Sequence, residues 1–197
     1  MKEISKILSK TIFIIFVLHT YQAEGKALNI GNKSAKVTVK VFSSLTCPHC
    51  ASFHEDIFYN LKKNFIDKGL VKFEHHSFPL DLAALNAEII VKCHVDKNSQ
   101  LQVLNKMYEK QKIWAVGSDI NKINESLKKI GAETDLTQQE MDKCLKNDSL
   151  QDEILNLRIK AQKKYKIEST PTILINEKKY NGKIEYKEFE KIIKKNL

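Results

Sequence analysis

Strand-like sequence is concentrated at the two ends of this 197-residue chain, and helical periodicity fills the middle. Residues 36–42 (KVTVKVF) alternate between apolar and polar side chains, and residues 69–78 (GLVKFEHHSF) form a second strand-like run. Residues 170–176 (TPTILIN) form a third, and residues 80–170 contain no proline. The chain must therefore build one sheet from segments that are far apart in the sequence.

Helical patterns connect and close these strands. Five apolar residues at helical spacing separate the first two strands, namely Phe53, Ile57, Phe58, Leu61 and Phe65. After the third strand, NEKK predicts a hairpin turn and residues 184–195 predict an amphipathic closing helix. Four or five helices are expected between residues 81 and 165. The sequence predicts an α/β protein in which residues 26–80 and 166–197 surround a helical insertion at 81–165.

The first residues predict export. Three lysines precede a short apolar run at residues 11–18 (TIFIIFVL), and small residues follow at 23–25 (AEG). We expect residues 1–25 to be a secretory signal peptide, so that the mature chain begins near Lys26. An uncleaved membrane anchor is the alternative, but a bilayer span needs ~20 apolar residues, which this run does not reach.

The charge of the chain favours no particular macromolecular partner. The 33 basic and 24 acidic residues give a net charge of +9 at pH 7 and are spread along the sequence. Short clusters such as KKYK at 163–166 are typical of solvated helix faces, and they lack the aromatic interleaving of nucleic-acid sites. We expect no nucleic-acid partner, and the basicity indicates solubility or weak attraction to anionic surfaces.

The tetrapeptide Cys47-Pro48-His49-Cys50 lies where the first strand gives way to a helix. Pro48 suits the first helical position, which makes Cys47 the expected N-cap. A sulfur there can accept from the N–H groups of His49 and Cys50 and sits at the positive end of the helix dipole. His49 could add to this stabilisation. The pattern predicts that Cys47 is acidic, exposed and nucleophilic, and that Cys50, one turn further, is its buried resolving partner.

Other roles for the cysteine pair fit less well. A zinc site needs a second pair, and Cys93 and Cys144 stand alone. Haem attachment needs a histidine after the second cysteine, but position 51 is alanine. A structural disulfide across two residues would remove little chain entropy. Redox catalysis without a metal or cofactor is therefore the favoured interpretation.

Two motifs carry a resemblance to a known family. FSSLTCPHC at 42–50 and STPTILIN at 169–176, with a helical insertion between them, resemble the DsbA family of periplasmic thiol:disulfide oxidoreductases. The resemblance implies a thioredoxin fold with an inserted helical domain. It implies Cys47 as the attacking thiol, Cys50 as the resolving thiol, and Pro171 as a cis-proline facing them, with Thr170 beside the thiolate.

The same resemblance implies a function and its alternatives. We expect a monomeric periplasmic oxidase that donates its disulfide to reduced, unfolded secreted proteins and is regenerated by a quinone-linked membrane partner of the DsbB type. A reductase or isomerase is the first alternative, because Thr170 is a residue type found before the proline in isomerase relatives. A non-catalytic metal-delivery or binding protein on the same scaffold is the second.

The chain departs from the family in two respects. Relatives often carry a buried acid on the strand leading into the site, whereas this strand offers Lys40 and leaves the proton-transfer residue open, with Glu55 and Asp56 as candidates by proximity. In an oxidising compartment, Cys93 and Cys144 are expected to form a second, structural disulfide. His75, His76 and His94 are expected on the surfaces of strands or helices, without a special role.

Overall fold

The computed structural model describes residues 27–197, so the expected signal peptide lies outside the described residues. Five strands form one sheet in the order β1-β3-β2-β4-β5. Their bounds are β1 Leu28–Ile30, β2 Val37–Ser43, β3 Val71–Ser77, β4 Thr172–Ile175 and β5 Lys178–Lys179. Only the β2–β3 pair is parallel among the pairings of these strands, and the others are antiparallel. Strand β2 thus pairs with β3 from the same end of the chain and with β4 from the other end, so the two ends build one sheet as the sequence pattern predicts.

Strand β2 is the middle strand of the sheet, and both of its faces are covered. Its alternate residues Val37, Val39 and Val41 are buried in the main core, and Phe42 points to a second cluster with Leu174. A strand covered on both sides is stabilised by apolar and β-branched residues, which explains the KVTVKVF composition.

A continuous helical run connects β2 to β3. It comprises α1 Pro48–Phe53, the π-helical η1 His54–Phe58, α2 Tyr59–Leu61 and the π-helical η2 Lys62–Ile66. The five apolar residues predicted to share one face of this helix are all buried. This crossover is what the parallel β2–β3 pairing requires.

The inserted segment forms six helices, one or two more than expected. They are α3 Leu82–Cys93, α4 Lys97–Glu109, α5 Gln111–Trp114, α6 Ile120–Ala132, α7 Gln138–Leu145 and α8 Asp148–Tyr165. Five of them begin at a side chain that caps the first turn, namely Asp81, Asp96, Asp119, Thr137 and Asn147. Gly131 does not end α6 but is buried inside its last turn, where a side chain would collide with Met141.

The chain ends as the sequence predicts, and begins with a strand that was not expected. Asn176 and Glu177 both have positive φ, the geometry of a tight hairpin turn between β4 and β5. The closing helix α9 Tyr186–Asn196 buries Phe189 and Ile193. Strand β1 is only three residues long, too short to show alternation, and it pairs with β3 at the sheet edge.

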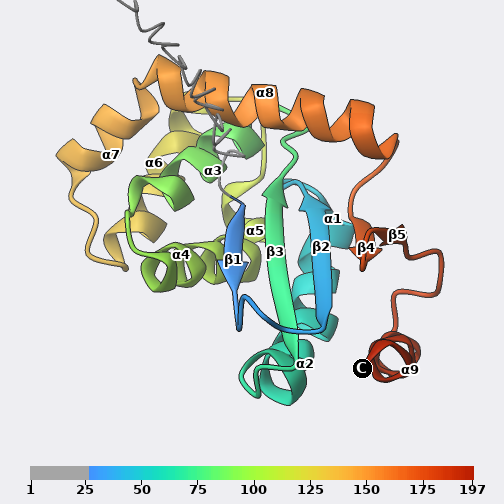
Figure 1. Cartoon of the computed structure of the whole chain (residues 1–197). Helices are drawn as coiled ribbons and strands as arrows, with labels where there is room; N and C mark the ends of the chain where they lie inside the picture. The colour runs from blue at the N-terminus through green and yellow to red at the C-terminus, as the bar shows by residue number, and fades with distance from the viewer. Residues whose placement is uncertain (1–26) are drawn as a thin grey trace, which may run out of the picture.

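One hydrophobic core runs through both parts of the molecule. It includes Val39 and Phe58 from the sheet part and Leu104, Trp114 and Met141 from the insertion. Figure 1 shows α3–α7 gathered beside the β1 edge of the sheet and α8 spanning from them to the β4 side. The fold is therefore a thioredoxin-like sheet with an inserted helical domain packed firmly against it.

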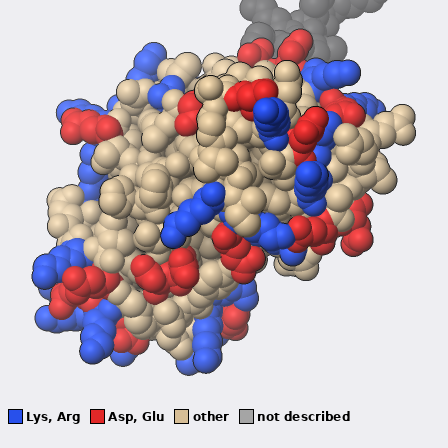
Figure 2. Space-filling model, turned by 180° about the vertical axis from the view of Figure 1, so that it is seen from behind, with Lys and Arg blue, Asp and Glu red and all other residues tan. Residues whose placement is uncertain are grey.

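The surface is charged but mixed. Figure 2 shows basic and acidic groups interspersed over the face opposite to that of Figure 1, around a broad uncharged area. Within residues 27–197, no helix combines the length and the apolar character needed to cross a bilayer.

Candidate active site

The two cysteines of CPHC lie at the junction of β2 and α1. Cys47 is the N-cap of α1, with extended backbone angles, and Pro48 occupies the first helical turn. The Cys47 carbonyl accepts from the N–H groups of Cys50 at 3.0 Å and Ala51 at 3.2 Å, which starts the helix. Both thiols are free, so the structure represents the dithiol form.

Cys47 is less exposed than the sequence predicts. Its side chain is 8% exposed and that of Cys50 is 1% exposed, whereas Pro48 and His49 lie at the surface. The expectation of an exposed Cys47 is wrong in degree, because the segment before β4 covers its sulfur: Cys47 Sγ donates to the Thr170 carbonyl at 3.3 Å. The order of accessibility, with Cys47 outside Cys50, is nevertheless that of a nucleophile and a resolving thiol.

The two thiols differ strongly in acidity. The pKa of Cys47 is lowered to about 5, mainly by hydrogen bonding from the Cys50 thiol and, to a smaller extent, by the Thr170 side chain and the backbone N–H groups of Cys50 and His49, against the opposing effect of burial. The pKa of Cys50 is raised by burial, by its hydrogen bond to Cys47 and by the charge of Cys47. The side-chain capping hydrogen bond expected of Cys47 is not formed in this dithiol state. The thiolate of this pair therefore belongs to Cys47.

Thr170 and Pro171 lie beside Cys47 at the start of β4, and the bond between them is cis. The Thr170 hydroxyl oxygen is buried and has no hydrogen-bond partner among the described residues. A buried, unpaired hydroxyl is costly unless it gains an acceptor. A Cys47 thiolate is such an acceptor, which explains why Thr170 contributes to the low pKa of Cys47.

The residues leading into Cys47 are held at three points that sequence reasoning did not find: two lie in the helical insertion, at Asp81 and Gln111, and the third is Leu80, immediately before the insertion. Thr46 Oγ1 donates to Asp81 at 2.7 Å, and the Leu80 N–H donates to Ser44 Oγ at 3.3 Å. From α5, Gln111 Nε2 donates to the carbonyls of Leu45 at 2.8 Å and Cys47 at 3.0 Å. The site thus depends on both parts of the chain.

A buried acid lies in the insertion rather than on the strand leading into the site. Glu88 of α3 is 1% exposed and contacts His75 Nε2 at 2.8 Å and Ser77 Oγ at 2.8 Å. Although burial raises its pKa, the positive charge available on His75 and the two hydrogen bonds bring the net pKa below its ordinary value. The surface position expected for His75 is therefore wrong, because its side chain pairs with Glu88 in the core. The candidates Glu55 and Asp56 are exposed.

Lys40, which occupies the strand in place of an acid, belongs to an ion-pair network on the other face of the sheet. It pairs with Glu177 of the β4–β5 turn and lies 3.9 Å from Glu74 of β3. In residues 27–197 no group of three or more His, Cys, Asp or Glu side chains is placed to hold a metal ion.

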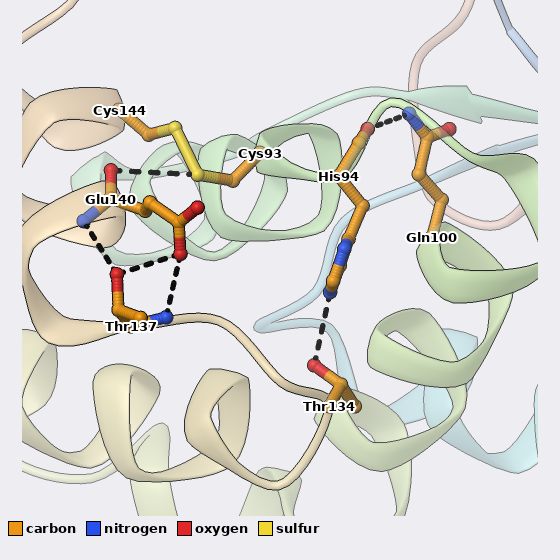
Figure 3. Close-up of a disulfide and its surroundings, with 7 residues drawn as sticks. All are labelled: Cys93, His94, Gln100, Thr134, Thr137, Glu140 and Cys144. Atoms are coloured by element: carbon orange, nitrogen blue, oxygen red, sulfur yellow. Dashed lines mark hydrogen bonds between the residues drawn. A yellow bond between two sulfur atoms is a disulfide. The ribbon is translucent and has the colours of Figure 1, made fainter.

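The second cysteine pair is bonded. Cys93 at the end of α3 joins Cys144 of α7, with their Cα atoms 5.9 Å apart and a sequence separation of 51 (Figure 3). Beside it, Thr137 and Glu140 form a capping box that begins α7. The bond fixes α7 to the helix that carries Glu88.

Comparisons with known proteins agree with this architecture. The model of the family described as thioredoxin matches residues 23–195. The chain is 33% identical over 178 residues to disulfide bond formation protein D of Bacillus subtilis, covering 85% of this chain and 76% of that protein. It is 31% identical over 157 residues to a putative protein-disulfide oxidoreductase of Rickettsia typhi, covering 80% of this chain but only 57% of the relative's length.

A solved structure is similar over nearly the whole fold. The crystal structure of alpha-DsbA1 from Wolbachia pipientis superposes with a TM-score of 0.78 at 26% identity, covering 86% of this chain and 89% of that one. The match includes the helical insertion as well as the sheet, because the insertion occupies the middle of the covered chain.

Proposed function

The chain belongs to the DsbA-like protein-disulfide oxidoreductases of the thioredoxin family, and we propose that it is an exported oxidase that donates the Cys47–Cys50 disulfide to folding proteins. Its substrates are reduced, unfolded secreted proteins. The observation that carries the proposal is the unequal pair of thiols, in which the pKa of Cys47 is about 5 while that of Cys50 is raised.

The reaction begins with the oxidised protein. A substrate thiolate attacks Cys47 Sγ, the bond between Cys47 and Cys50 breaks, and the electron pair leaves on Cys50 Sγ, which takes up a proton because its pKa is high. The product is a mixed disulfide between the substrate and Cys47. Attack falls on Cys47 because it is the more exposed of the two sulfurs.

The second step releases the oxidised substrate. A second substrate thiolate attacks the substrate sulfur of the mixed disulfide, a substrate disulfide forms, and Cys47 leaves as a thiolate. Its low pKa makes it a good leaving group, and the hydroxyl of Thr170 is placed to donate to it. The protein ends reduced, with a Cys47 thiolate and a protonated Cys50 thiol. It has gained two electrons from the substrate; of the two protons that the substrate thiols release, one is taken up by Cys50 and the other goes to solvent.

The carbonyl of Thr170 has a separate part in substrate binding. In the dithiol form it accepts from the Cys47 thiol. A Cys47 sulfur joined to substrate carries no proton, so this carbonyl becomes free to accept from the backbone of an extended substrate segment. The substrate backbone can therefore bind to the Thr170 carbonyl at the same time as the mixed disulfide forms.

The setting of the reaction follows from the same proposal. Residues 1–25 act as the signal peptide, the protein works as a monomer in the periplasm, and a quinone-linked membrane oxidase of the DsbB type restores the disulfide. We assign residues 26–80 and 166–197 to the catalytic part and 81–165 to the insertion.

Denaturation of the two redox forms at neutral pH tests the oxidase assignment. A Cys93→Ala/Cys144→Ala background leaves the Cys47–Cys50 pair as the only difference between the forms. The oxidase proposal requires the dithiol form to be the more stable. An oxidised form that is clearly more stable would indicate a reductase instead.

The pH dependence of that difference gives a second check. The pKa of Cys47 is lower in the folded dithiol form than in the unfolded chain, so its thiolate stabilises the folded form fully above ~8.5. This contribution shrinks as the pH falls and is lost below about 5. The advantage of the dithiol form should therefore decline between these limits.

A further inference from the structure

Gln111 connects the helical insertion directly to the backbone of the reacting cysteine. Its side chain is 5% exposed, and its amide nitrogen donates to the carbonyls of Leu45 and Cys47, at sequence separations of 66 and 64. Of the side-chain hydrogen bonds formed by residues 27–197, this is the one that reaches the Cys47 carbonyl. We propose that Gln111 is a positioning residue that sets the reactivity of Cys47, an inference that rests on the proposed role of Cys47.

The short helix α5 aims the Gln111 side chain rigidly. The Gln111 carbonyl accepts from the Ala115 N–H at 2.8 Å, and the Ile113 N–H donates to Lys110 at 2.8 Å, so the turn is closed at both ends. Trp114 is fully buried and its indole Nε1 donates to the Met107 carbonyl at 2.7 Å. The position of Gln111 is thus fixed by the core of the insertion.

The amide of Gln111 orients the carbonyl that begins α1. The Cys47 carbonyl accepts from Gln111 and also from the N–H groups of Cys50 and Ala51. A carbonyl held by donors from two elements cannot rotate, so the backbone of Cys47 keeps its extended conformation. That conformation keeps the N–H groups of His49 and Cys50 directed toward the sulfur, where they stabilise a thiolate.

The two donated hydrogen bonds also have a direct electrostatic effect. The Cys47 carbonyl belongs to the same residue as the reacting sulfur, and the Leu45 carbonyl comes two residues before it; the negative end of an unpaired carbonyl disfavours a nearby thiolate. Gln111 directs the positive ends of its N–H groups at both oxygens. The insertion therefore contributes to the acidity of Cys47 without touching its sulfur.

Loss of Gln111 should not release the loop as a whole. Thr46 remains bonded to Asp81, and Ser44 remains bonded to the Leu80 N–H. A variant at Gln111 is therefore expected to keep the fold while changing the environment of Cys47.

The test is a pH titration of the thiolate absorbance of the reduced protein, with Gln111→Met compared with the unchanged chain. Methionine has a similar length and no N–H donor. We expect the pKa of Cys47 to rise by about one unit, and the equilibrium with glutathione to shift about tenfold toward the disulfide form. A second variant, Gln111→Glu, is used if the methionine variant does not fold. Glutamate has nearly the same shape as glutamine, but its carboxylate can only accept hydrogen bonds, so this variant must also raise the pKa of Cys47.

Gln100→Met is the matched control. Gln100 Nε2 donates to the His94 carbonyl at 2.6 Å in the same insertion, and His94 directly follows Cys93 of the second disulfide (Figure 3). This control should lower the unfolding midpoint without moving the pKa of Cys47. If the pKa of Cys47 is low in the original protein and equally low in both Gln111 variants, the role of Gln111 is overturned and the proposed function stands. An ordinary pKa in the unchanged chain would overturn both it and the proposed function.

Discussion

The molecule contains two cysteine pairs that differ in sequence spacing, in bonding and in the role each can perform. Cys93 and Cys144 are separated by 51 positions, connect two helices and are bonded. Cys47 and Cys50 are separated by 3 positions, with two residues between them in the first turn of α1, and both are free in the dithiol form. A cross-link over a long loop removes much conformational entropy from the unfolded chain, whereas a loop of two residues removes little. The first pair is therefore suited to stabilise the fold and the second to react.

The environment of each pair reinforces this difference. Cys47 is surrounded by groups that stabilise its reduced, ionised form, including the Cys50 thiol, the Thr170 hydroxyl and two backbone N–H groups. Stabilising the thiolate weakens the disulfide from which it forms. The comparison teaches that the reactivity of a cysteine pair comes from the groups that stabilise its reduced sulfur.

The largest expected effect is on turnover. Cys47→Ser removes the attacked sulfur and should abolish oxidation of reduced substrate peptides, measured as the rate of substrate disulfide formation. The double variant Cys93→Ala/Cys144→Ala should retain turnover, because neither residue lies at the site. A double variant as inactive as Cys47→Ser would show that the division of labour between the pairs is wrong.

The double variant Cys93→Ala/Cys144→Ala, which should keep its turnover, should lose stability. Removing the Cys93–Cys144 bond opens a loop for which the chain-entropy model gives roughly 4 kcal/mol, an upper value because native strain subtracts from it. Urea denaturation of the double variant, with Cys47 and Cys50 reduced in both samples, measures the loss. A loss below ~1 kcal/mol would mean that the second disulfide has a purpose other than stabilisation.

The two thiols of the reactive pair should be distinguishable by alkylation. At mildly acidic pH Cys47 is ionised and 8% exposed, whereas Cys50 is protonated and 1% exposed. Because the thiolate is the nucleophile, Cys47 should be labelled at least about tenfold faster, as followed by mass spectrometry of the reduced protein. Equal labelling, or a preference for Cys50, would reverse the roles of the two cysteines.

The sequence contains enough to predict the strands, the closing helix and the general plan, because their patterns are local. The alternation of β2, the helical face from Phe53 to Phe65 and the turn at Asn176 each depend on neighbouring residues. His75 could also have been placed in the core, because it lies two residues after Phe73 and so on the same face of β3.

The parts that could not be predicted depend on contacts across the sequence. Gln111 is an ordinary polar residue until the fold brings it to the carbonyl of Cys47, and Glu88 resembles a surface charge until His75 and Ser77 pair with it. The exposure expected for Cys47 was too high for the same reason, since Thr170 arrives from the other end of the chain. No local pattern specifies such partners.

A smaller effect is expected at Thr170. Thr170→Val keeps the size of the side chain but removes the buried hydroxyl that lowers the pKa of Cys47. We expect the pKa to rise by up to about one unit, which corresponds to ~30 mV of lost oxidising power. The unfolding midpoint of the oxidised form should stay the same or rise, because an unpaired buried hydroxyl is removed. A redox potential equal to that of the unchanged protein would exclude Thr170 from the support of the thiolate.

The smallest expected effect is at His49, and it separates the backbone from the side chain. The backbone N–H of His49 is the last and weakest of the named groups that lower the pKa of Cys47. His49→Pro removes that donor in the first turn of a helix, where proline is tolerated, and should raise the pKa by less than about one unit. His49→Ala keeps the N–H and removes only the exposed imidazole, so it should leave the pKa and the redox potential unchanged. If both variants shift the potential equally, the imidazole is the active group, and the support of Cys47 includes a side chain from the surface of the site.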